Sequence, residues 1–64
     1  MYRLTNLTQN TTTTYKNRDL VYQALERENA KVKHQKAEAV LLVEELDKKN
    51  VVIYQEDIYL PFEG

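Results

Sequence analysis

The 64-residue chain contains no cysteine and no tryptophan, and it has a single histidine, glycine and proline. The lack of cysteine excludes a disulfide framework and any zinc site built on thiolates. With His34 as the single histidine, a transition-metal site within one chain is unfavourable, and we expect neither a metal nor another cofactor. A chain this short buries only about 60% of the surface that its unfolded form exposes. A small protein without disulfides or a structural metal is usually stabilised by association, so we expect a homo-oligomer.

Long apolar runs are also missing. No stretch approaches the roughly 20 apolar residues that span a bilayer. The first ten residues, MYRLTNLTQN, lack the apolar core of a signal peptide. We therefore expect one small domain, residues 1–64, in the cytoplasm, with no membrane partner. If the chain is phage-encoded, the expected location is the host cytoplasm.

Charge is distributed unevenly, although the net charge is only −1. Residues 1–36 carry seven Lys/Arg against three Asp/Glu, a balance of +4. Residues 37–64 carry two against seven, a balance of −5. This polarity suits antiparallel or head-to-tail self-association, or a nucleic-acid contact through the basic half. An uneven solvated surface is the simpler interpretation.

Residues 1–16 predict a β-hairpin. Apolar and polar residues alternate at the start, and the run NTTTTY supplies β-branched residues that fit a pleated, half-exposed strand. A two-residue turn at positions 9–10 returns the chain and places Leu4 opposite Tyr15. A flexible, low-complexity arm is the alternative for this segment.

Residues 17–50 are predicted to be helical. Asn17 is a suitable N-cap, and residues 18–49 contain neither glycine nor proline. An apolar stripe runs along the segment, and we expect it to carry self-association: Val21, Leu25, Val32, Ala39, Leu42 and Leu46. The stripe weakens over residues 26–36, so a pair of helices broken near Asn29 is the alternative to one long or kinked helix.

The remaining residues predict a second hairpin over 51–61 and a short tail at 62–64. A tight turn at Glu56-Asp57 places Tyr54 opposite Tyr59. The fold class expected is α+β, in the order β-β-α(α)-β-β. With one long helix the two hairpins lie far apart, and an antiparallel pair of chains would join the first hairpin of one chain to the last hairpin of the other.

Familiar catalytic motifs are absent from the sequence. The chain lacks GxxxxGK[ST], HExxH and GxSxG. Its densest acidic stretch, Glu44, Glu45 and Asp47, is predicted to lie on the solvated side of the helix. We therefore expect no enzymatic activity. Five tyrosines are candidates for interface anchors, and equally for core residues: Tyr2, Tyr15, Tyr22, Tyr54 and Tyr59.

A basic cluster in the middle of the chain is the candidate nucleic-acid contact. Arg27, Lys31 and His34 fall near one helical face, and Lys33 and Lys36 lie adjacent. A basic helix followed by a second helix and a hairpin is similar to a winged-helix module, in which the hairpin is the wing. That resemblance concerns element order, and Glu56 and Asp57 at the wing tip would repel phosphate.

The function expected from these features is a small non-catalytic accessory or regulatory module that acts through self-association or by binding a partner protein. The composition, rich in asparagine, threonine, lysine and tyrosine, is typical of accessory proteins of bacteria, phages or mobile elements. The alternative is a winged-helix-like regulator that binds nucleic acid through residues 27–36.

Overall fold

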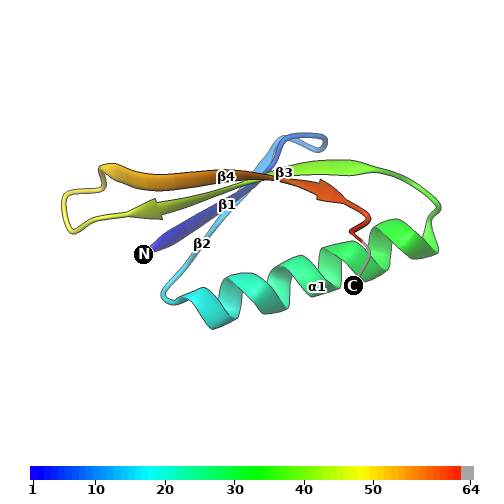
Figure 1. The fold of residues 1–64 in the computed structure, drawn as a ribbon, viewed down its shortest axis with the longest axis horizontal. Coiled ribbons are helices and arrows are strands. Elements are labelled where there is room, and N and C mark those ends of the chain that lie inside the picture. The colour runs from blue at the N-terminus through cyan, green and yellow to red at the C-terminus, as the bar shows by residue number, and fades with distance from the viewer. Residues whose placement is uncertain (63–64) are drawn as a thin grey trace.

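The computed structural model describes residues 1–62 of the chain. Four strands and one helix follow in the order β-β-α-β-β, which confirms the predicted order and the α+β class (Figure 1). The elements are β1 (Tyr2–Asn6), β2 (Thr11–Tyr15), α1 (Arg18–His34), β3 (Ala39–Leu46) and β4 (Val52–Leu60).

The predicted first hairpin is present, but its register differs from the prediction. Leu4 faces Thr13 and not Tyr15. The connection is longer than two residues because the Asn6 carboxamide oxygen accepts hydrogen bonds from the peptide N–H groups two and three positions on, both at 3.0 Å. Asn10 closes the loop with a φ of 59°, a conformation that asparagine tolerates.

Helix α1 begins where the sequence predicts and ends much earlier. The Asn17 side chain accepts a hydrogen bond from the Leu20 N–H at 3.0 Å, which caps the first turn. After His34 the chain turns at Lys36, whose φ is 52°, and runs into β3. The predicted helix over residues 17–50 is therefore wrong for its second half. Within the described residues no helix has the length and apolar character needed to span a membrane.

The four strands form one antiparallel sheet in the order β2-β1-β3-β4. The predicted turn at Glu56-Asp57 is wrong, because β4 runs straight through these residues and pairs with β3. The β3–β4 turn instead lies around Asp47, whose carboxylate accepts the N–H groups of Lys49 at 2.8 Å and Val51 at 2.9 Å. The predicted hairpin of residues 51–61 is thus replaced by a longer one, and no partner chain is needed to complete the sheet.

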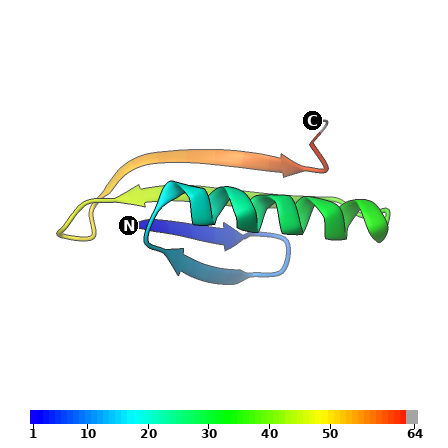
Figure 2. The ribbon, with the colours of Figure 1, turned by 90° about the horizontal axis from the view of Figure 1, so that it is seen from below.

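Helix α1 covers the middle of one sheet face, over β1 and β3 (Figure 2). Alternation along the strands sends Leu4 and Leu41 toward the helix, where they are buried against Val21, Leu25 and Val32. We call this the helix side of the sheet and the opposite side the open face. The core is completed from the helix, from β3 and from the end of β4: Ala24, Ala39 and Leu60.

Candidate functional site

The two edges of the sheet differ in length and chemistry. Edge strand β2 has five residues, of which four are exposed threonines. Edge strand β4 has nine residues and no proline, and its most exposed large apolar side chains are Ile53 (59% exposed), Tyr54 (54%) and Tyr59 (68%). Natural proteins protect a long apolar edge because it pairs readily with another strand. The β4 edge is therefore the stronger candidate for a binding surface.

The register of the sheet shows which backbone groups of β4 are free. The Leu7 N–H donates to the Val40 carbonyl at 2.8 Å, so Val40 directs its backbone groups away from β4. Because this direction alternates along a strand, Val43 points toward β4 and exchanges hydrogen bonds with its partner Glu56. Backbone groups of the β4 residues that alternate with Glu56 and Ile58 therefore point outward, away from β3. These residues are Gln55, Asp57 and Tyr59.

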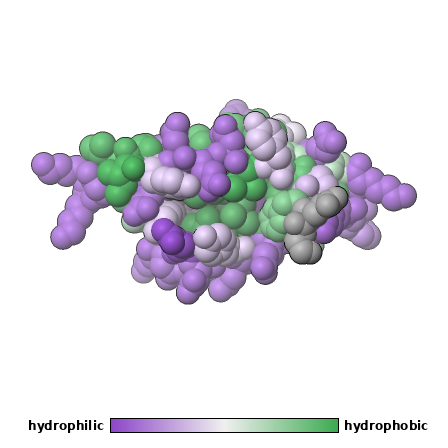
Figure 3. Space-filling view, viewed as in Figure 1, coloured by the Kyte–Doolittle hydropathy of each residue, from purple (hydrophilic) through white to green (hydrophobic). Residues whose placement is uncertain are grey.

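A groove runs between β4 and α1, next to this edge. It consists of two adjoining hollows, of about 290 Å³ and 570 Å³, which share Tyr22, Leu25 and Ile58 in their linings. Phe62, at the end of the described chain, closes the larger hollow. In the space-filling view apolar side chains are visible in the hollow between sheet and helix and at the β3–β4 tip (Figure 3). We call the groove together with the free edge of β4 the β4 margin.

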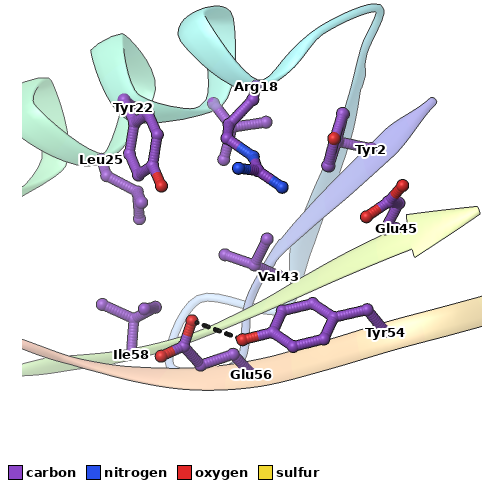
Figure 4. A pocket seen from close by; sticks show the side chains of 10 residues that line it. Tyr2, Arg18, Tyr22, Leu25, Val43, Glu45, Tyr54, Glu56 and Ile58 are labelled. Carbon is purple, nitrogen blue, oxygen red and sulfur yellow. Dashed lines mark hydrogen bonds between the residues drawn. The ribbon is translucent and has the colours of Figure 1, made fainter.

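Polar and apolar side chains converge on the smaller hollow (Figure 4). The Tyr54 hydroxyl donates to the Glu56 carboxylate at 3.2 Å, and the negative charge of Glu56 raises the pKa of Tyr54. Arg18 points into the hollow from the helix, and Glu45 lies at its far end. Tyrosine rings, one guanidinium and two carboxylates thus surround an apolar floor.

The phenylalanine that closes the groove is fixed by the helix. Asn29 is buried on α1, and its carboxamide oxygen accepts a hydrogen bond from the Phe62 N–H at 3.0 Å. This contact satisfies a buried polar side chain and draws the chain after β4 back over the helix. The end of the groove is therefore part of the folded structure.

The acids predicted to lie on a solvated helix are separated by the sheet. On the open face Glu44 is buried, and it accepts two hydrogen bonds from the Arg3 guanidinium, at 2.8 and 3.0 Å. These bonds hold the pKa of Glu44 below its usual range. Glu45 points to the helix side, whereas Asp47 organises the β3–β4 turn. The three carboxylates thus lie on opposite sides of the sheet and in a turn, and do not converge on one point.

The predicted basic cluster lies on α1 and just after it. Arg27, Lys31, Lys33 and His34 are exposed on the second half of the helix, and Lys36 occupies the turn that follows. Glu28 pairs with Lys31 at 3.8 Å and neutralises part of the charge. Because β3 follows this helix directly, the second helix of a winged-helix arrangement is not found in the described residues.

The predicted self-association stripe does not form a single surface. Val21, Leu25 and Val32 are buried in the core of the same chain. Ala39 and Leu46 belong to β3, and Leu42 points to the open face opposite Asp57. Their seven-residue spacing on the sequence is a coincidence of a buried helix face and a two-sided strand.

The β4 margin itself is the surface that the sequence analysis missed. Its signal was present in the run VVIYQEDIYL, which is rich in β-branched and aromatic residues and is not interrupted by glycine or proline. Among the described residues no three His, Cys, Asp or Glu side chains lie where they would hold a metal ion. Comparison with protein-family models, with curated proteins and with solved structures finds no match.

Proposed function

We propose that the chain is a non-catalytic protein-interaction module and that the β4 margin is its contact surface. The observation that carries the proposal is the combination, on one edge, of outward backbone groups and exposed Ile53, Tyr54 and Tyr59. Strand addition to such an edge obtains affinity from main-chain hydrogen bonds and specificity from alternate side chains. Tyrosine is also favoured at protein interfaces, because one end of the ring is apolar and the hydroxyl bonds to polar groups.

The proposal is tested by capturing proteins from the cell that encodes the chain with immobilised wild type and two variants. Tyr59→Ser removes an exposed aromatic side chain from β4 while leaving the core intact. Leu7→Ser is the matched control, because Leu7 is similarly exposed (51%) but follows β1 in a loop. We expect a protein that is retained by the wild type and the Leu7 variant and lost with the Tyr59 variant. Equal retention by all three forms contradicts the proposal.

Nucleic-acid binding is the second candidate, supported by the exposure of Arg27, Lys31 and His34 on one side of α1. Such a patch would bind phosphates without reading sequence, so its affinity falls steeply with salt. A gel shift with arbitrary duplex DNA at low salt tests it. Binding that is lost on replacing Arg27 and Lys31 by glutamine and kept with Lys48→Gln supports this function. No shift at low salt removes it.

A further inference from the structure

The charges around the β4 margin are mainly negative. Four acidic residues border the β4 margin, against one guanidinium, that of Arg18: Glu26, Glu45, Glu56 and Asp57. Two of these acids, Glu56 and Asp57, are adjacent at the middle of β4, and alternation places one on each side of the sheet. An incoming strand therefore meets negative charge on both of its faces at the same point.

A second copy of the chain is a poor match for this edge. In an antiparallel pair of β4 strands, the register with the greatest overlap is centred on Glu56. That register sets the two Glu56 carboxylates directly opposite each other, and like charges in this position destabilise a strand pair. The acidic pair thus protects the edge from self-pairing in the way that charged residues protect other exposed edges.

The same two acids favour a partner strand that carries positive charge. Two adjacent cationic residues present one charge to each face, opposite Glu56 and Asp57. Residues on either side of that pair then meet Tyr54 and Ile58 on the helix side and Tyr59 on the open face. These neighbours favour β-branched or aromatic partners across the strands.

We infer that β4 accepts, as a fifth strand, an extended segment of a partner protein with two adjacent Lys or Arg residues flanked by β-branched or aromatic residues. The inference rests on the proposed function and specifies its partner. The acids repel a second copy and attract the basic strand, so a single pair of residues selects between the two occupants. Because both acids are exposed, the selection weakens as salt is added.

Two peptides test the inference on the full chain. One is Val-Thr-Val-Lys-Arg-Val-Thr-Val, and the matched control is Val-Thr-Val-Glu-Asp-Val-Thr-Val. The measurement is amide hydrogen exchange by NMR at neutral pH and low salt. We expect about 1 mM of the basic peptide to slow exchange about tenfold at the outward amides, Gln55, Asp57 and Tyr59. The inward amides of Tyr54, Glu56 and Ile58 serve as the internal reference, and the acidic peptide leaves all six unchanged.

Charge reversal provides the second arm. In a chain with Glu56→Lys and Asp57→Lys, we expect the acidic peptide to slow the remaining outward amides, at Gln55 and Tyr59, and the basic peptide to lose its effect. Glu38→Lys, which alters an exposed acid away from β4, should keep the wild-type preference.

Three results overturn the inference. Equal slowing by both peptides removes the charge selection, and no slowing removes the fifth strand. Slowing without peptide that grows with protein concentration shows that a second copy occupies the edge. None of these results bears on the capture experiment with Tyr59→Ser, which tests the proposed function separately.

Discussion

At the scale of single residues, the open face is organised by one ion pair. Glu44 is buried between β1 and β4, and the Arg3 guanidinium reaches both of its oxygens. Such a two-bond contact fixes geometry better than a single contact, although solvent screens the exposed arginine. Because Arg3 lowers the pKa of Glu44 in the folded chain, the pair adds stability above the unfolded pKa, about 4.3. That stability is lost as pH falls through the lower, folded pKa.

Glu44→Gln should therefore lower the thermal unfolding midpoint at pH 7, where the carboxylate is charged. The difference from the wild type should narrow as pH falls below about 4, because the wild-type carboxyl becomes neutral too. Thermal unfolding followed by circular dichroism across this range makes the comparison. Glu38→Gln, an exposed change of the same kind, is the control. A midpoint difference that stays constant with pH contradicts the assigned role of the pair.

The most deeply buried side chain is Leu41, which is 1% exposed at the centre of β3 beneath α1. Leu41→Ala leaves a cavity that the short chain has few neighbours to fill, and such changes cost roughly 2–5 kcal/mol. We expect a loss in that range, measured by urea unfolding with an unchanged denaturant slope. Val40→Ala alters the next residue, which is only half-buried on the open face, and should cost less. A loss below roughly 1 kcal/mol for Leu41→Ala contradicts its place in the core.

At the scale of elements, sequence reasoning succeeded where the signals are local and failed at β3. The N-cap at Asn17 and the presence of the first hairpin follow from capping chemistry and local strand propensity, and both are confirmed, although the turn and register of the hairpin differ from the prediction. The run AVLLVEEL instead contains good helix formers and extends the apolar stripe, so it predicts a helix. As a strand it is apolar on both faces, which hides the alternation that identifies a strand. Pairing with β1 on one side and β4 on the other decides its structure. β1 is distant in sequence, and the hairpin with β4 depends on the turn at Asp47, which lies where the sequence predicts the end of a helix.

The candidate surface was missed for the same reason. Tyr54 and Tyr59 were recognised as candidate anchors, but a turn at Glu56-Asp57 would have folded them into a small hairpin. The two acids lie instead inside a continuous strand, where β3 holds one side of the backbone and the other side is free. Which side of β4 is free depends on the position of β3, and this position is not readable from the residues of β4 alone.

Proline substitutions distinguish the two sides of β4. The Glu56 N–H points to β3, so Glu56→Pro removes a ladder hydrogen bond and leaves the Val43 carbonyl unpaired, at a cost of about 1–3 kcal/mol. Asp57→Pro removes an outward donor and should cost less, because an edge strand tolerates proline where its N–H faces solvent. Urea unfolding of the two variants makes the comparison. Equal losses contradict the assignment of the free edge.

At the scale of the whole molecule, residues 1–62 of one chain form a four-stranded sheet and a core beneath the helix. Its largest dimension is 38 Å against 21 and 16 Å for the other two, because the β3–β4 hairpin extends beyond the helix (Figure 1). The expectation of a homo-oligomer came from the small core and the lack of disulfides or a metal, whereas the long helix that kept two hairpins apart motivated only the antiparallel pairing of two chains. The four-stranded sheet joins both hairpins within one chain, so that pairing is not needed, and β4 stands at the edge where we propose that a further strand binds.

The charge of the β4 edge should then control whether the chain associates with itself. Replacing the two central acids, Glu56→Gln with Asp57→Asn, removes the repulsion between two β4 strands while keeping similar side-chain volumes. We expect the variant to form dimers in sedimentation equilibrium at tens of micromolar, whereas the wild type stays near 7.6 kDa. A control with the same net charge, Asp19→Asn with Glu38→Gln, changes exposed acids outside β4 and should behave as the wild type. Dimers formed equally by all three proteins would show that the two acids do not guard the edge, and dimers formed by the control alone would place the self-association surface away from β4.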